Sequence, residues 1–112
     1  MRDPRARLLD ILEAIDRIQE RLPAHRTAFE HDEVVQVWVA HHARIIGEAA
    51  RVLPEEVRRQ MADVRWAQWV GFRHILVHEY FRVDPDVVWR VAAGELTGLR
   101  ATIERWLAEH PD

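Results

Sequence analysis

The chain has 112 residues, and its 16 basic and 19 acidic side chains give a formal net charge of −3. A negative net charge argues against a protein that binds nucleic acid over a broad surface, but it does not exclude a local basic cleft. This length fits one domain, residues 1–112, and a hydrophobic share of 48% supplies a single core. Cysteine is absent from the sequence, which excludes disulfide scaffolds, thiolate nucleophiles and zinc held by Cys.

Apolar residues recur at steps of three and four over 8–22, which is the spacing of an amphipathic helix. This pattern predicts a first helix that stops before Pro23. The polar segment 25–31 is expected to be a connection, with room for a short turn around Phe29. No alternation of apolar and polar residues marks a strand anywhere in the chain, so the sequence predicts an all-α fold.

Asp32 is a candidate N-cap for a second helix, whose apolar positions recur as far as Leu53. Pro54 either ends that helix or opens a short third helix, expected over 55–60. A fourth helix is expected over 66–81, where bulky apolar residues are dense.

The segment 84–86, Asp-Pro-Asp, has the composition of a helix start, with an N-cap, a proline at the first position and an acidic first turn. A fifth helix therefore begins there, and its apolar stripe continues to Leu107. Gly94 and Gly98 are expected to break or kink it. We expect an antiparallel bundle of four main helices plus a short one, without repeats or linkers.

The sequence also bears on where the protein acts. No uninterrupted apolar run approaches the roughly 18 residues of a membrane span. The N-terminal residues 1–5 lead into an amphipathic stretch and not into the apolar core of a signal peptide. These features predict a cytoplasmic protein with no membrane partner.

The segment 71–81 is the densest cluster of polar and aromatic residues, and it contains the spacing R-x4-H. With 16 Arg and 7 His among 112 residues, about one such pair is expected by chance. The chain has three of them: Arg26/His31, Arg73/His78 and Arg105/His110. Only Arg73/His78 lies in a strongly apolar helix, and only this pair is followed by Tyr80, the single tyrosine of the chain.

Helix geometry separates the members of this pair. Five residues of an α-helix span about 500°, so Arg73 and His78 point about 140° apart and do not easily converge on one ligand within one protomer. Tyr80 is expected to share the face of Arg73, and His74 that of His78. Two facing copies of the helix would bring Arg and His from both chains into one cleft, which favours a site in a symmetric dimer.

Arginine and paired histidines are sufficient for RNA cleavage without a metal ion. An Arg fork binds a phosphodiester and stabilises the charge that builds on a pentavalent phosphorus. One His can take the proton of a ribose 2′-OH, and a second can protonate the leaving 5′ oxygen.

Two alternatives compete with this interpretation of the residues. The residue types alone favour a structural role, with Arg73 paired to a buried carboxylate and His78 and Tyr80 satisfied in the core. His74 and His78 also have the spacing of two metal ligands, with Glu79 nearby. No cysteine and no third ligand in register accompany them, so we expect neither a metal nor another cofactor.

A series of ordered blocks runs through the chain. They are Ile45-Ile46-Gly47-Glu48-Ala49-Ala50, Trp66, Val70-Gly71-Phe72-Arg73, Ile75-Leu76-Val77-His78-Glu79-Tyr80-Phe81, Val83-Asp84 and Val88-Trp89. Together these blocks resemble the HepT-like proteins, which are HEPN-domain toxins of the HepT/MNT toxin–antitoxin systems. The resemblance covers most of the chain, from the first helix to the stretch 99–107.

The resemblance implies an all-α HEPN bundle that forms a homodimer with a composite cleft. It further implies a metal-independent endoribonuclease that cuts cellular RNA, with tRNA as one kind of target. Arg73 and His78 match the two catalytic motif positions. Tyr80 matches the tyrosine to which the cognate MNT nucleotidyltransferase antitoxin attaches AMP from ATP, and an anionic nucleotide there would block the phosphate site.

One position departs from the family pattern. The residue after the motif Arg is usually Asn, and here it is His74, which we interpret as an auxiliary site residue. The alternative from another functional class is a non-catalytic HEPN module that recruits or regulates a nucleotidyltransferase or binds nucleotides. The intact set of Arg73, His78 and Tyr80 favours the enzyme.

Overall fold

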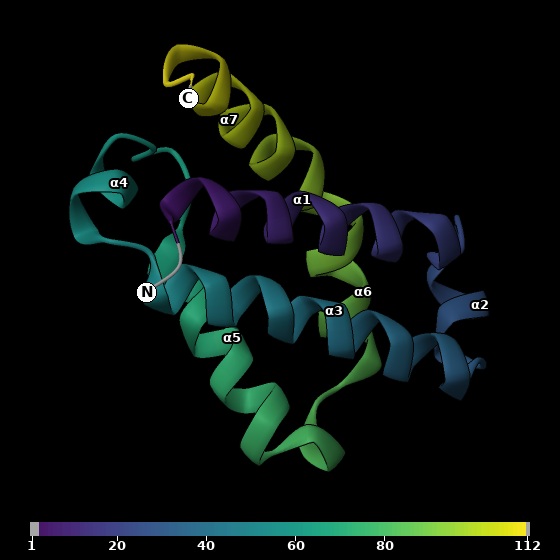
Figure 1. The fold of residues 1–112 in the computed structure, drawn as a ribbon. Coiled ribbons are helices and arrows are strands. Elements are labelled where there is room, and N and C mark those ends of the chain that lie inside the picture. The colour runs from purple at the N-terminus through teal and green to yellow at the C-terminus, as the bar shows by residue number, and fades with distance from the viewer. Residues whose placement is uncertain (1–2, 112) are drawn as a thin grey trace.

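The computed structural model describes residues 3–111, so both ends of the predicted domain 1–112 lie outside the described residues. Within this range the chain forms seven α-helices and one short 3-10 helix, with no strand, which confirms the all-α class (Figure 1). The helices are α1 (Pro4–Arg21), α2 (Arg26–Glu30), α3 (Glu33–Val52), α4 (Glu55–Arg59), α5 (Trp66–His78), the 3-10 helix η1 (Tyr80–Arg82), α6 (Pro85–Gly94) and α7 (Leu96–Glu109).

The helix starts follow from local capping. Asp32 accepts a hydrogen bond from the backbone N–H of Val35 at 3.1 Å at the start of α3. Asp84 accepts one from the backbone N–H of Asp86 at 2.9 Å at the start of α6. Both predicted N-caps are therefore confirmed, and each satisfies a backbone donor that has no partner within its own helix.

Helix α3 is the centre of the fold, with its most extensive contacts to α1 on one side and α5 on the other (Figure 1). The α1 side chains that recur at steps of three and four are completely or almost completely buried. They are Leu8, Ile11, Ala14, Ile15 and Ile18. Helix α7 packs on the side of α1 opposite α3 (Figure 1). Helix α6 contacts both α2 and α3. This central position allows residues of α3 to support those of α5.

The structure has more helices than the expected four main and one short. The turn around Phe29 is the short helix α2, which buries Phe29 in the core. The C-terminal stretch is two helices separated at Glu95, so the predicted break occurs next to Gly94, whereas Gly98 lies inside α7. None of the helices in residues 3–111 is both long and apolar enough to cross a membrane.

The fourth predicted helix, over 66–81, is too long. Helix α5 ends at His78 because Glu79 leaves the helical conformation, with φ −136° and ψ 30°. The 3-10 turn η1 follows, closed by bonds from the Arg82 N–H to Glu79 O at 2.8 Å and from the Val83 N–H to Tyr80 O at 3.1 Å. Tyr80 therefore lies outside α5, and the expectation that it shares a helical face with Arg73 is wrong.

Candidate active site

Arg73 lies on the face of α5 that packs against α3, beside Gly47. A Cβ added at Gly47 would lie 2.3 Å from the Cβ of Arg73 and 2.7 Å from the carbonyl oxygen of Trp69. Both distances are far below van der Waals contact, so only glycine fits at this point of the α3–α5 contact. The glycine thereby lets the two helices approach closely, and this contact fixes the position of the Arg73 Cβ along α3.

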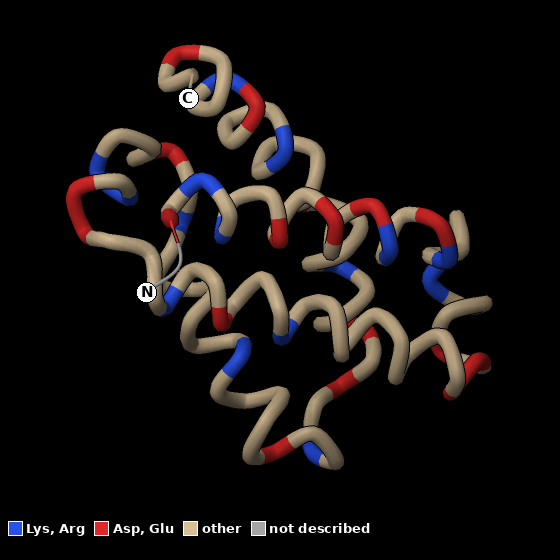
Figure 2. The backbone as a smooth tube through the Cα atoms, in the orientation of Figure 1, with Lys and Arg blue, Asp and Glu red and all other residues tan. Residues whose placement is uncertain are grey.

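The guanidinium of Arg73 is held by a carboxylate on the next residue of α3. Its Nε lies 2.9 Å from Oε2 of Glu48, and the two side chains are 29% and 38% exposed. Arg51 holds the same carboxylate with two hydrogen bonds, from Nη2 to Oε1 at 2.7 Å and from Nε to Oε2 at 3.2 Å. Figure 2 shows charged segments of α3 and α5 next to each other where these helices pack.

The two arginines stabilise the charged form of this carboxylate. The hydrogen bond from Arg51 is the main cause that lowers the pKa of Glu48, and the positive charges of Arg73 and Arg51 lower it further against the opposing effect of burial. Glu48 is therefore ionised at neutral pH. No hydrogen bond joins the terminal nitrogens of Arg73 to another residue in the described part of the chain, so these donors remain open for an anion.

His74 and His78 are exposed on α5, and their ring centroids lie 4.6 Å apart. This confirms that the two histidines share a face, one helical turn apart. Because Arg73 and His78 both lie in α5, ideal helix geometry still predicts an angle of about 140° between them. We therefore do not expect them to meet at one ligand within one chain.

The structural alternative is realised only in part. Arg73 does have a carboxylate partner, but that carboxylate is partly exposed. His78 is exposed and Tyr80 is half-buried, so neither is enclosed in the core. Among residues 3–111, no group of three His, Asp or Glu side chains gathers closely enough to hold a metal ion.

Tyr80 borders a groove of about 430 Å³ between the start of α3 and α6. Glu33 and Phe81 also border this groove, and the Phe81 side chain is 98% exposed. Burial, and secondarily the negative charge of Glu33, raises the pKa of the Tyr80 phenol. The phenol is therefore protonated at neutral pH. The groove does not include Arg73 or His78 among its lining residues.

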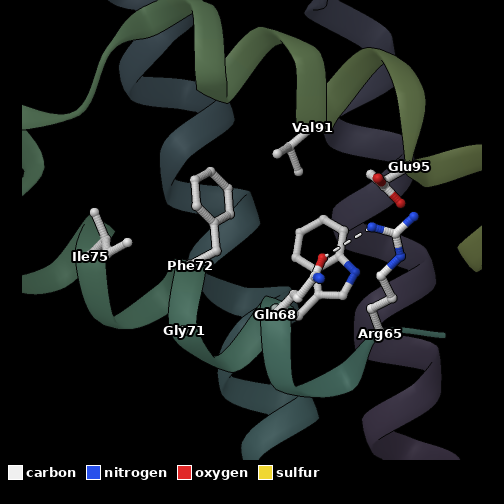
Figure 3. Close-up of a pocket in the computed structure, with 8 residues that line it drawn as sticks. Arg65, Gln68, Gly71, Phe72, Ile75, Val91 and Glu95 are labelled. Atoms are coloured by element: carbon white, nitrogen blue, oxygen red, sulfur yellow. Dashed lines mark hydrogen bonds between the residues drawn. The ribbon is translucent and has the colours of Figure 1, made fainter.

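The side of α5 turned away from α3 borders a second, apolar groove. It has a volume of about 380 Å³, and its apolar part is lined by Phe72 and Ile75 of α5 and Val91 of α6 (Figure 3). Its other end is polar and is lined by Arg65, Gln68 and Glu95. Ile75 is 42% exposed. Helix α5 thus carries apolar residues on the side turned away from α3 as well as the buried Trp69 and Leu76, which is typical of a helix that is covered on two faces.

Sequence reasoning did not assign a role to Gly47 or Glu48, although both lie in the block 45–50. A local signal was present for one contact, because Glu48 and Arg51 are three residues apart on one helix. The contacts of Glu48 and Gly47 with Arg73 join residues 25 and 26 positions apart, so they become visible only when α3 and α5 are packed together.

Residues 11–106 match the family described as ribonuclease HepT-like. The chain belongs to this family. It is 32% identical over 104 residues to "Putative RNase MJ1380" of Methanocaldococcus jannaschii, which covers 92% of this chain and 95% of the relative. It is also 32% identical over 101 residues to "Probable ribonuclease HepT" of Thermococcus cleftensis, covering 88% and 90% of the two chains.

A third relative, "Putative RNase TTE0752" of Caldanaerobacter subterraneus, is 32% identical over 108 residues, which is 96% of each chain. No solved structure matches the chain significantly. Membership of the HepT-like family confirms the resemblance drawn from the sequence blocks and supports ribonuclease activity in general.

Proposed function

We propose that this HepT-like protein is the toxin of a toxin–antitoxin pair and acts in the cytoplasm. It cuts cellular RNA, including tRNA, and needs no metal ion to do so. The observation that supports the site most directly is the arrangement on α5. Arg73 is fixed by Glu48 with its terminal nitrogens open, and the exposed pair of His74 and His78 follows on the same helix. Family membership supplies the reaction class, which is cleavage of RNA.

In the proposed reaction, Arg73 binds a non-bridging oxygen of the phosphodiester and stabilises the charge that builds there. The ribose 2′ oxygen attacks phosphorus while one His accepts its proton, and the bond to the 5′ oxygen breaks while a second His protonates that oxygen. The products are a 2′,3′-cyclic phosphate and a free 5′-OH. His78 is the first candidate for these proton transfers, and His74 is auxiliary.

We further propose that the working site is composite and belongs to a homodimer. Arg73 and His78 diverge within one chain, so a second copy of α5 is needed to bring them to one phosphate. The apolar groove lined by Phe72, Ile75 and Val91 provides a surface for that contact. On a helical projection His78 lies close to Gly71 and Ile75, so a partner that covers this groove would approach His78.

Tyr80 is the proposed point of control, with an MNT-type nucleotidyltransferase as the partner. That enzyme would transfer AMP from ATP to the Tyr80 hydroxyl and release pyrophosphate. The residue is half-buried and borders a groove that is large enough to admit a polar group. It lies two residues beyond His78, so an added nucleotide would place a bulky anion beside the histidine pair. Such an anion would compete with the phosphates of RNA for the same cations.

The experiment that tests the activity is cleavage of total tRNA by purified protein in EDTA. Wild type is expected to cut, and His78→Ala is expected to be inactive. His110→Ala is the matched control because His110 belongs to an R-x4-H pair with Arg105 but lies at the end of α7, away from α5. Absence of cleavage by wild type shown by intact mass to be unmodified would favour the non-catalytic HEPN module.

The dimer is tested with Ile75→Glu, which places a charge in the apolar groove. Leu9→Glu is the matched control, because Leu9 is a similarly exposed apolar residue, at 49%, on α1. Ile75→Glu is expected to sediment as a folded monomer without cleavage activity, whereas Leu9→Glu remains a dimer and active. A fully active monomer would contradict the composite site.

AMP transfer is tested by intact mass after incubation with the cognate nucleotidyltransferase and ATP. Wild type is expected to gain mass in steps of AMP and to lose cleavage activity. Tyr80→Phe keeps cleavage but gains no mass. Addition of AMP to the Tyr80→Phe protein would show that another residue is modified.

A further inference from the structure

The contact between Glu48 and Arg73 is the feature that the cleavage chemistry does not by itself explain. We infer that Glu48 is a positioning residue, which fixes the Arg73 guanidinium so that its terminal nitrogens are presented to a phosphodiester. The inference rests on the proposed ribonuclease function, since it names a further residue for the same site. Glu48 does not contact the reacting atoms and acts only through Arg73.

The geometry restrains Arg73 at two points along its side chain. Gly47 lies against the Cβ of Arg73, and Glu48, the next residue of α3, lies 2.9 Å from its Nε. The flexible bonds between these points lose most of their freedom before any substrate arrives. A guanidinium held in advance binds an anion without the loss of rotamer entropy that a free Arg would suffer.

The choice of nitrogen supports a positioning role. The shortest contact of Glu48 with Arg73 is to Nε, at 2.9 Å, whereas the flat fork with which Arg binds phosphate in two contacts needs its terminal nitrogens as well. A carboxylate that masked the site would be expected to take the fork itself. Here the terminal nitrogens have no hydrogen-bond partner within the described residues, so the pair orients the guanidinium and leaves its binding edge open.

Arg51 explains how a carboxylate can serve this purpose without neutralising the site. It holds Glu48 with two hydrogen bonds from the same helix, at 2.7 and 3.2 Å, so the carboxylate is itself fixed. The two arginines and one glutamate carry a net charge of +1. The cluster therefore still attracts a phosphate, and the negative charge of Glu48 is shared between two cations.

The test is Glu48→Gln, which keeps the size of the side chain and removes its charge. A positioning role predicts a fall in kcat/KM for tRNA cleavage of roughly tenfold or more. The melting temperature should change little, because partly exposed ion pairs add little to stability. Arg51→Met, which removes the two hydrogen bonds that hold the Glu48 carboxylate, is expected to act in the same direction with a smaller effect. Higher activity in Glu48→Gln would show that Glu48 masks Arg73 and would overturn the inference.

The matched control is Glu55→Gln, which removes the carboxylate of another Glu–Arg ion pair, that with Arg59 at 3.1 Å on α4. Its cleavage rate should equal that of wild type. The second readout is tRNA binding by protein that carries His78→Ala and cannot cut. Glu48→Gln should weaken binding there severalfold, but should have no effect once Arg73 is also replaced by Ala.

These outcomes separate the inference from the function on which it rests. If wild type cuts tRNA and Glu48→Gln cuts equally well, the positioning role is wrong and the ribonuclease stands. If Glu48→Gln weakens binding equally with and without Arg73, the residue acts structurally and the inference is also wrong. If wild type does not cut RNA at all, both fail together.

Discussion

Replacing Gly47 by Ala adds one methyl group at the tightest point between α3 and α5. The new Cβ would lie 2.3 Å from the Cβ of Arg73 and 2.7 Å from the carbonyl oxygen of Trp69. Neither atom is the end of a flexible side chain, so relief requires a shift of one helix against the other. Overpacking of this kind costs about 1–3 kcal/mol, and a rigid backbone contact belongs to the upper part of that range.

An opposing gain must be subtracted, because Ala is more stable than Gly in the interior of a helix by roughly 0.5–1 kcal/mol. We therefore expect the free energy of unfolding to fall by about 2 kcal/mol. For a chain of 112 residues the melting temperature drops by roughly 4 °C per kcal/mol, which gives a decrease of about 8 °C.

The assay is thermal unfolding monitored by circular dichroism. All variants are measured at one protein concentration, because the melting temperature of a dimer depends on concentration. Gly98→Ala is the matched control, since Gly98 also lies inside a helix, α7, and a Cβ there would meet no atom within 4 Å. It should stabilise the protein by roughly 0.5–1 kcal/mol. A Gly47→Ala protein as stable as Gly98→Ala would refute the close contact between α3 and α5.

Three further outcomes follow from the helix caps and the titratable groups. Asp84→Ala removes the bond to the Asp86 N–H and should cost about 1 kcal/mol in urea unfolding. The lowered pKa of Glu48 stabilises the fold above the ordinary glutamate range, and this stabilisation disappears as the pH falls through the lowered value. Below roughly pH 4.3, the unfolding free energy of wild type should therefore fall more steeply than that of Glu48→Gln. Because Tyr80 is the only tyrosine, phenolate absorbance should titrate above the ordinary pKa of about 10, and Glu33→Gln should lower that midpoint. A midpoint unchanged by Glu33→Gln would contradict the electrostatic contribution of Glu33.

The parts of the fold that local sequence determines were predictable. The α1 stripe and the Asp32 and Asp84 caps depend on residues within a few positions of one another, so period and capping chemistry are sufficient to find them. The end of α5 was not predictable in this way, because no glycine or proline follows His78 closely. The chain leaves the helix at Glu79, and Tyr80 and Val83 then pack against the core, which is a tertiary effect.

The candidate site shows the same division. The motif residues Arg73 and His78, and their divergence on α5, follow from spacing and helix geometry. The carboxylate that holds Arg73 comes from α3, and a sequence with 19 acidic residues offers many other candidates. Only the packing of α3 against α5, which Gly47 permits, selects Glu48 from among them.

Two adjacent residues of α3 thus act on the two ends of one side chain, and this makes their effects separable. Gly47 determines how closely α3 and α5 pack, so Gly47→Ala should lower stability and cleavage together. Glu48 contacts Arg73 only at its partly exposed guanidinium, so Glu48→Gln should lower cleavage while stability stays nearly constant. If the two variants lost stability and activity in the same proportion, Arg73 would be a packing residue of the α3–α5 contact and not the phosphate-binding group of the site.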